Sequence, residues 1–166
     1  MILCDCGWLI LPDPDNISDY KAKFDLHTDL ILSENLYENG TPIAKYIAEV
    51  SVDEENKIPE CYVDNGAMLI FVGVDNGGWY VDSDTSLQLN FQQKRVDMKG
   101  VEMAGTLEVG YVYEGRVKWC QVTDSISNNI QLLLEEGNYY ICLRNASSDR
   151  IIITNGSINI KKTQEE

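Results

Sequence analysis

The chain contains a single histidine, so every catalytic arrangement that needs an imidazole base depends on His27. The alternating stretch 24–30 predicts a strand with Asp25, His27 and Asp29 on one face. Flanking carboxylates favour the protonated imidazole, which is the wrong state for a general base. The sequence also lacks the nucleophile-elbow, phosphate-loop and zinc-protease motifs. We therefore expect no enzyme, with a hydrolase that uses a pair of the 27 acids as the alternative.

Two acidic stretches, residues 13–19 and 75–85, contain the kind of oxygen ligands that calcium prefers. Neither has the residue order of an EF-hand, and Asp, Asn and Gly are also the ordinary residues of turns. No other cofactor is expected. The candidate calcium ligands lie in the first stretch and are Asp13, Asp15, Asn16 and Asp19.

The stretch 75–85 also carries an indole and a phenol next to two glycines. A ring in such a loop either folds back into the core or stacks on a ligand such as a sugar, with Asp and Asn side chains as hydrogen-bonding partners. Both interpretations stay open from the sequence. The residues of this candidate ligand site are Asp75, Asn76, Trp79, Tyr80, Asp82 and Asp84.

Five cysteines cannot all pair within one chain, and their spacing indicates no disulfide framework. Cys120 and Cys142 lie in apolar runs, where we expect them to be buried and reduced. Cys4 and Cys6 could supply two thiolate ligands to a metal. Structural zinc needs a second pair of cysteines or histidines, and the chain has one histidine.

The elements that would position these residues are short strands, because apolar residues alternate over brief runs separated by Gly, Asn and Asp. The run 67–73 is apolar throughout, as in a strand covered on both faces. Residues 107–113 and 117–122 predict a hairpin, and Asn155-Gly156 predicts another between 151–153 and 157–160.

Together these strands predict one all-β domain over residues 1–166, an antiparallel, jelly-roll-like β-sandwich. Residues 1–60 form a more irregular part that carries 13 of the acids and 4 of the bases, and residues 161–166 form a polar tail.

The net charge of −14 disfavours nucleic acid and anionic membranes as partners. No run is long enough to span a membrane, and the apolar N-terminus lacks the basic region of a secretion signal. An extracellular or cell-surface location therefore requires a signal upstream of Met1; otherwise the protein is cytoplasmic.

The stretch Glu136–Asn145 contains the spacing Gly-x-Tyr-x-Ile and is followed by a second apolar run, Ile151–Ile160. It resembles the closing strands of bacterial extracellular β-sandwich modules, namely pre-peptidase C-terminal domains and, more loosely, GOLD-type sandwiches. Gly77–Val81 is similar to the entry of such modules into a middle strand, so the resemblance covers residues 77–160. It implies a sandwich fold without catalytic activity and transfers no catalytic residue.

The sequence thus favours a non-catalytic binding or interaction module of the extracellular bacterial type, with a protein or a glycan as partner. One alternative is a carbohydrate-binding sandwich supported by calcium. Another is a small phage-type or intracellular inhibitor, whose acidic face engages a basic protein.

Overall fold

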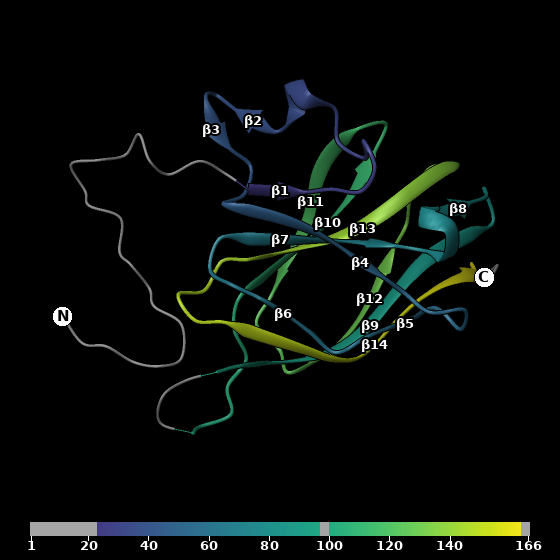
Figure 1. Ribbon diagram of the computed structural model, residues 1–166. Coiled ribbons are helices and arrows are strands. Elements are labelled where there is room, and N and C mark those ends of the chain that lie inside the picture. Colours follow the sequence, from purple (N-terminus) through teal and green to yellow (C-terminus); the bar gives the residue numbers. More distant parts are fainter. Residues whose placement is uncertain (1–22, 97–99, 164–166) are drawn as a thin grey trace.

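Two β-sheets pack face to face in the computed structural model, which describes residues 23–96 and 100–163 (Figure 1). The all-β sandwich that the sequence predicts is confirmed, since strands dominate the described chain and its helical segments are single 3₁₀ turns. Among these residues, no helix is long and apolar enough to cross a membrane.

The larger sheet has seven strands. Its order is β1-β4-β7-β13-β10-β11, and β8 also pairs with β13. The pairs β1–β4 and β4–β7 are parallel, while the other pairs are antiparallel. Its strands are β1 (Lys23–Asp25), β4 (Tyr46–Ser51), β7 (Ala67–Val72), β8 (Trp79–Val81), β10 (Leu107–Tyr113), β11 (Arg116–Thr123) and β13 (Gly137–Asn145).

The smaller sheet has five strands in the order β12-β9-β14-β5, with β6 also paired to β14. All of its pairs are antiparallel. Its strands are β5 (Lys57–Ile58), β6 (Cys61–Val63), β9 (Thr85–Arg95), β12 (Ser127–Leu132) and β14 (Ile151–Lys162).

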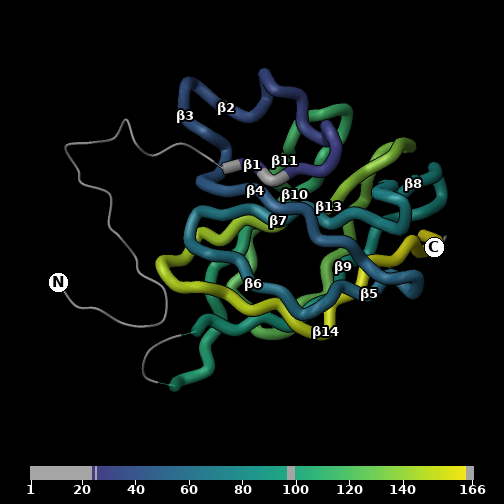
Figure 2. Tube along the Cα trace, in the orientation of Figure 1, coloured from purple at the N-terminus to yellow at the C-terminus, as the bar shows by residue number. Residues whose placement is uncertain are grey.

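The main core lies between the two sheets, and a second core lies on the outer face of the larger sheet. Residues 26–45 cover this outer face, and we call them the cover segment (Figure 2). They include the 3₁₀ turn η2 (Ser33–Asn35) and the short strands β2 (Tyr37–Glu38) and β3 (Thr41–Pro42). Strand β7 contributes to both cores, so all six of its residues are buried, as the apolar run predicts.

The hairpin predicted around residues 114–116 is confirmed. Tyr113 pairs with Arg116, which leaves Glu114 and Gly115 as a two-residue turn. Both have positive φ, 50° and 75°, as the tight turn between twisted strands requires.

The hairpin predicted at Asn155-Gly156 is wrong. β14 continues through this site as one strand, and a register shift against β9 leaves one extra residue between Thr154 and Ser157. Asn155 has a φ of 49°, which suits a β-bulge as well as a turn. A Cβ on Gly156 would lie 2.8 Å from the Cβ of Ile58, so glycine lets β5 pack closely at the bulge.

The strand predicted over residues 24–30 is shorter than expected. It ends at Asp25, and His27 is exposed in a bend, because the chain turns there to begin covering the outer core. A strand face shared by Asp25, His27 and Asp29 therefore does not form.

The cysteine prediction is correct for Cys142 and wrong for Cys120. Cys142 is fully buried in the central strand β13. Cys120 is exposed because β11 is an edge strand, paired only with β10. Both are free thiols, and burial raises the pKa of each, with the larger rise at Cys142.

We expect a thiol-alkylating reagent to label Cys120 in the native protein, faster as the pH rises and thiolate forms, and to label Cys142 only after unfolding. Peptide-resolved mass spectrometry separates the two sites. Equal native labelling rates for Cys120 and Cys142 would contradict the burial of β13.

Candidate functional site

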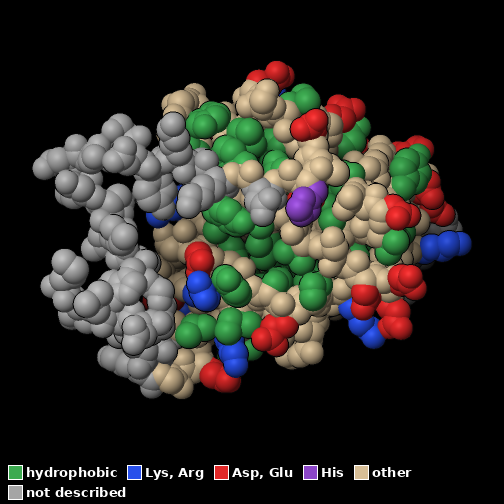
Figure 3. All heavy atoms as spheres, in the orientation of Figure 1, with side chains coloured by type: hydrophobic (Ala, Val, Ile, Leu, Met, Phe, Trp, Pro, Cys, Tyr) green, Lys and Arg blue, Asp and Glu red, His purple; other side chains and the backbone are tan. Residues whose placement is uncertain are grey.

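Five connections between strands meet at one end of the sandwich, which we call the acidic end. β4 and β7 run parallel and finish there, and β13, which is antiparallel to β7, begins there. The connections are residues 52–56, 73–78, 82–84, 114–115 and 133–136. Figure 3 shows acidic side chains gathered on the side of the molecule where Figure 1 places β8.

These connections carry nine acidic residues. They are Asp53, Glu54, Glu55, Asp75, Asp82, Asp84, Glu114, Glu135 and Glu136. Of the nine, Glu55 alone forms an ion pair with a described residue, at 2.6 Å from Lys57. The other described bases at this end are Arg116, Lys161 and Lys162. The acidic end therefore has an excess of unpaired negative charge.

The connections at the opposite end are different. Their described acids are Asp64, Glu102, Asp124 and Asp149. Three of these four pair with a base: Asp64 with Arg150, Glu102 with Lys94, and Asp149 with Arg95.

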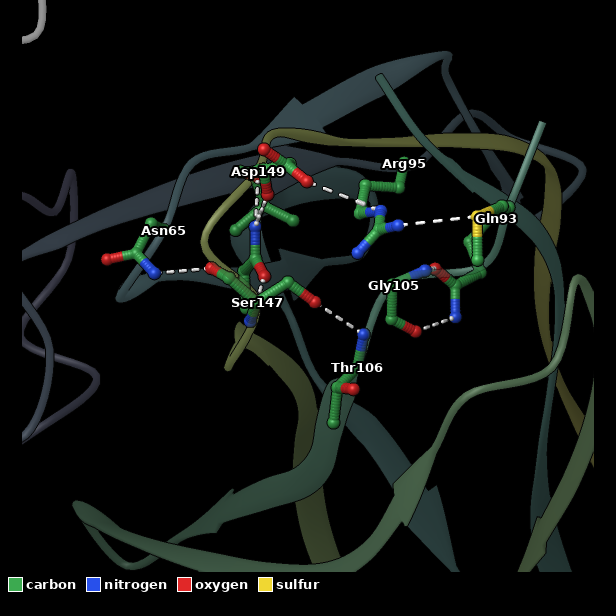
Figure 4. A network of polar contacts seen from close by, with 10 residues as sticks. Asn65, Gln93, Arg95, Gly105, Thr106, Ser147 and Asp149 are labelled. Carbon is green, nitrogen blue, oxygen red and sulfur yellow. Dashed lines mark hydrogen bonds and ion pairs between the residues drawn. The ribbon is translucent and has the colours of Figure 1, made fainter. Parts of the chain in front are cut away.

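A polar network ties the loops of this opposite end together (Figure 4). The buried Gln93 donates to the carbonyl of Gly105 and accepts from its N–H, both at 2.9 Å. Asn65 donates to the carbonyl of Ser147, whose hydroxyl accepts from the N–H of Thr106. These contacts are internal and join the loops of this end.

The candidate ligand loop lies at the acidic end, but its indole is not available to a ligand. Trp79 is 6% exposed and packs in the main core, whereas its neighbour Tyr80 is 53% exposed. β8 pairs with β13, placing Trp79 opposite Tyr139 and Tyr80 opposite Asn138. Of the two interpretations of Trp79, the plug is correct, and stacking of this indole on a sugar is wrong because the pairing of β8 turns the ring inward.

The polar residues of this loop serve mainly as turn residues. Asp75 and Asn76, in the 3₁₀ turn η3 (Val74–Asn76), both have positive φ. The N–H of Asp82 donates to Thr85 Oγ1 at 2.7 Å, and the carbonyl of Asp84 accepts from the N–H and hydroxyl of Thr163. Within the described ranges, no three Asp, Glu, His or Cys side chains converge as metal ligands would.

The candidate calcium ligands Asp13, Asp15, Asn16 and Asp19 lie outside the described residues. Their calcium role stays a prediction.

A cavity of about 450 Å³ opens beside the loop, between the cover segment and the ends of β10 and β13. Its polar lining comes from Asp29, Glu114 and Asn138, and its aromatic ring is that of Tyr140. Tyr113 also borders the cavity, but its ring packs on Tyr139 at the other face of the larger sheet. The remaining lining residues are Leu30, Val112, Gly115 and Gly137. Tyr140 links this cavity to the predicted loop, because its hydroxyl donates to the carbonyl of Asn76 at 3.3 Å.

Sequence reasoning missed this cavity. The turn at Glu114 and the tyrosines of β10 are recognisable as a hairpin, but Asp29 reaches the site from 85 positions earlier in the chain. A weak signal was present in the excess of acids among residues 1–60.

Tyrosines at this end lie in a negative field. The hydroxyl of Tyr80 donates to Glu136 Oε1, and this bond is the main reason its pKa is raised. The charge of Glu114 is the main cause of the raised pKa of Tyr113. Burial raises the pKa of Tyr139, with a smaller contribution from Glu135. A field that disfavours further negative charge favours a cationic ligand.

No protein family model matches the chain, and no curated protein matches it in sequence. The resemblance to pre-peptidase C-terminal and GOLD-type modules therefore stays a prediction.

We expect Trp79→Ala to lower the free energy of unfolding by about 3–5 kcal/mol, because it removes a large buried ring from the main core. Tyr80→Ala is the matched control: it changes the adjacent residue on the opposite, exposed face of β8 and should cost about 1 kcal/mol or less. Chemical denaturation measures both. A Trp79 variant as stable as the Tyr80 variant would show that the indole does not support the core.

Proposed function

We propose that the protein is a non-catalytic interaction module that binds a basic segment of a partner protein through its acidic end. The proposal keeps the interaction module that the sequence favours. From the inhibitor alternative it takes the acidic face that engages a basic protein. The observation that carries it is the uneven pairing of charge between the two ends of the sandwich.

Both ends of the sandwich are built from loops, so both could hold internal ion pairs. At the opposite end, three of the four described acids pair with a base, whereas at the acidic end only Glu55 among the nine pairs with a base of the described chain. Like charges held close together repel one another and reduce the stability of the folded state. A cationic partner would remove this repulsion on binding. The unpaired acids would then favour binding, although they do not stabilise the folded protein by itself.

The same field would speed the approach of a basic partner. Charges on the rim of an interface steer encounter and raise the association rate, and salt screens the effect. We therefore expect association with a basic partner to slow as ionic strength rises.

The test is a selection from a library of displayed peptides against the folded protein. We expect the enriched peptides to be rich in Arg and Lys. The triple variant Asp75→Asn/Asp82→Asn/Glu135→Gln should weaken their binding by about tenfold or more, because each rim charge contributes a fraction of a kcal/mol to more than 1 kcal/mol.

The matched control is Glu38→Gln/Glu60→Gln/Asp124→Asn, which changes the net charge equally at exposed acids outside the acidic end. It should bind nearly as well as the unaltered protein. Enrichment of neutral or acidic peptides, or equal losses in the two triple variants, would overturn the proposal.

A second candidate function, carbohydrate binding, is favoured by the outer face of the smaller sheet. None of the 27 acids lies in the five strands of this sheet. The registers align uncharged polar side chains in three rows across the sheet, which we call the amide face. The rows are Ser127, Gln92 and Thr154; Asn129, Asn90 and Ser157; and Gln131, Gln88 and Asn159.

Amide side chains both donate and accept hydrogen bonds, which matches the hydroxyl groups of a neutral glycan. A shallow hollow of about 730 Å³ opens at the end of this face, where Gln88, Gln131 and Leu133 contribute to its wall. Gln88 Oε1 is buried and accepts no hydrogen bond from the described chain, while its amide nitrogen donates to Asn129.

A glycan array tests this candidate. We expect retained glycans to lose about tenfold in affinity with Gln131→Ala, because Gln131 lines the hollow and one hydrogen bond to a ligand hydroxyl is worth about that much. Gln121→Ala is the control, since it removes the same exposed side chain from β11 in the other sheet. No retained glycan, or the same loss in both variants, would remove carbohydrate binding as a function of this face.

A further inference from the structure

The cavity at the acidic end combines charge, an aromatic ring and a fixed shape. Two carboxylates, Asp29 and Glu114, and the amide of Asn138 line it together with the ring of Tyr140. Neither carboxylate belongs to any ion pair among the described residues. Its volume of about 450 Å³ lies in the range of sites that enclose a small ligand or one side chain with its backbone.

Two hydrogen bonds from the cover segment hold the turn that carries Glu114. The N–H of Leu32 donates to the carbonyl of Gly115 at 3.1 Å, and the side-chain amide of Asn35 donates to the same oxygen at 2.9 Å. A Cβ on Gly115 would lie 2.6 Å from Cγ of Leu32, so only glycine allows this close approach. The cover segment, which brings Asp29, is thereby fastened to the turn that brings Glu114.

The strand ends that carry the lining are fixed as well. At the main-core face of the larger sheet, Tyr113 stacks on Tyr139, with ring centroids 4.8 Å apart and planes inclined by 21°. A Cβ on Gly137 would lie 2.8 Å from Cε2 of Tyr113, so this glycine makes room for the ring. The hydroxyl of Tyr140 donates a hydrogen bond to the carbonyl of Asn76. A site whose groups are ordered before binding loses less entropy when the ligand arrives.

We propose that this cavity is a socket for the guanidinium group of an arginine side chain, which the partner protein presents at the acidic end. The inference rests on the proposed function and names the side chain that the site recognises.

A guanidinium fits this lining better than other ligand groups. It is planar, remains charged, donates several hydrogen bonds in its plane to carboxylates and amides, and stacks against aromatic rings. A lysine ammonium is a more compact and more strongly hydrated charge, so it engages rings and separated carboxylates less well. A phosphate or carboxylate ligand would meet the repulsion of Asp29 and Glu114.

The probe is N-acetyl-arginine methylamide, titrated against the folded protein and followed by backbone amide NMR. We expect shifts centred on Gly115, Gly137 and Asn138. The citrulline analogue keeps the shape but removes the charge, and it should bind about tenfold more weakly or worse, as loss of charge-assisted hydrogen bonds predicts. The lysine analogue should fall between the two.

The variant Asp29→Asn/Glu114→Gln should lose the arginine-induced shifts. Its control, Asp75→Asn/Glu135→Gln, changes the same charge at the same end outside the cavity lining and should keep them. Thermal unfolding checks that both variants remain folded. Equal binding of the arginine and citrulline probes, or equal losses in the two variants, would overturn the socket.

The two proposals fail separately. If selected basic peptides depend on the acidic end but bind the Asp29→Asn/Glu114→Gln variant unchanged, the socket is wrong and the proposed function stands. If the arginine probe binds in the cavity but the selection enriches no basic peptides, the socket stands and the proposed function is wrong.

Discussion

Apolar packing on both faces of β7 is the constraint on which the architecture depends. This strand is buried along its whole length, with Leu69 and Phe71 in the main core and Met68 and Ile70 in the outer core. A strand buried on both faces needs a layer on each side. The smaller sheet supplies one layer, and the cover segment supplies the other. The covering of β7 thus also brings residues from the start of the described chain to the hairpin turn of β10 and β11.

The burial of so many strand positions also determines where charge can lie. An ionised carboxylate is strongly disfavoured in an apolar interior unless it is paired, so acids concentrate in the connections. The direction of β4, β7 and β13 then decides which connections meet. The result, among the described residues, is a sandwich with mostly paired acids at one end, mostly unpaired acids at the other, and an acid-free amide face on the smaller sheet.

Two local motifs show how tertiary context decides between alternatives that are equally good in the sequence. Glu114-Gly115 and Asn155-Gly156 both place a polar residue and a glycine between β-forming runs, and in both pairs the polar residue has positive φ. The first turns the chain because β11 returns along β10. The second forms a bulge because β9 continues on both sides of it and pairs with β14 before and after the irregularity. Backbone preference alone does not distinguish the two outcomes, since the long-range partner supplies the hydrogen bonds.

The sequence by itself determined the features that depend on local pattern. Alternation indicated most of the strands, and the unbroken run 67–73 indicated a strand covered on both faces. The tertiary structure alone decided that Trp79 points inward while Tyr80 points outward, and that Cys120 lies on an uncovered edge. It also decided that Asp29 meets Glu114 and Tyr140 in one cavity. The physical reason is that a side-chain period fixes which residues share a face, whereas the exposure of that face and its neighbours depend on strand pairing between residues far apart in the chain.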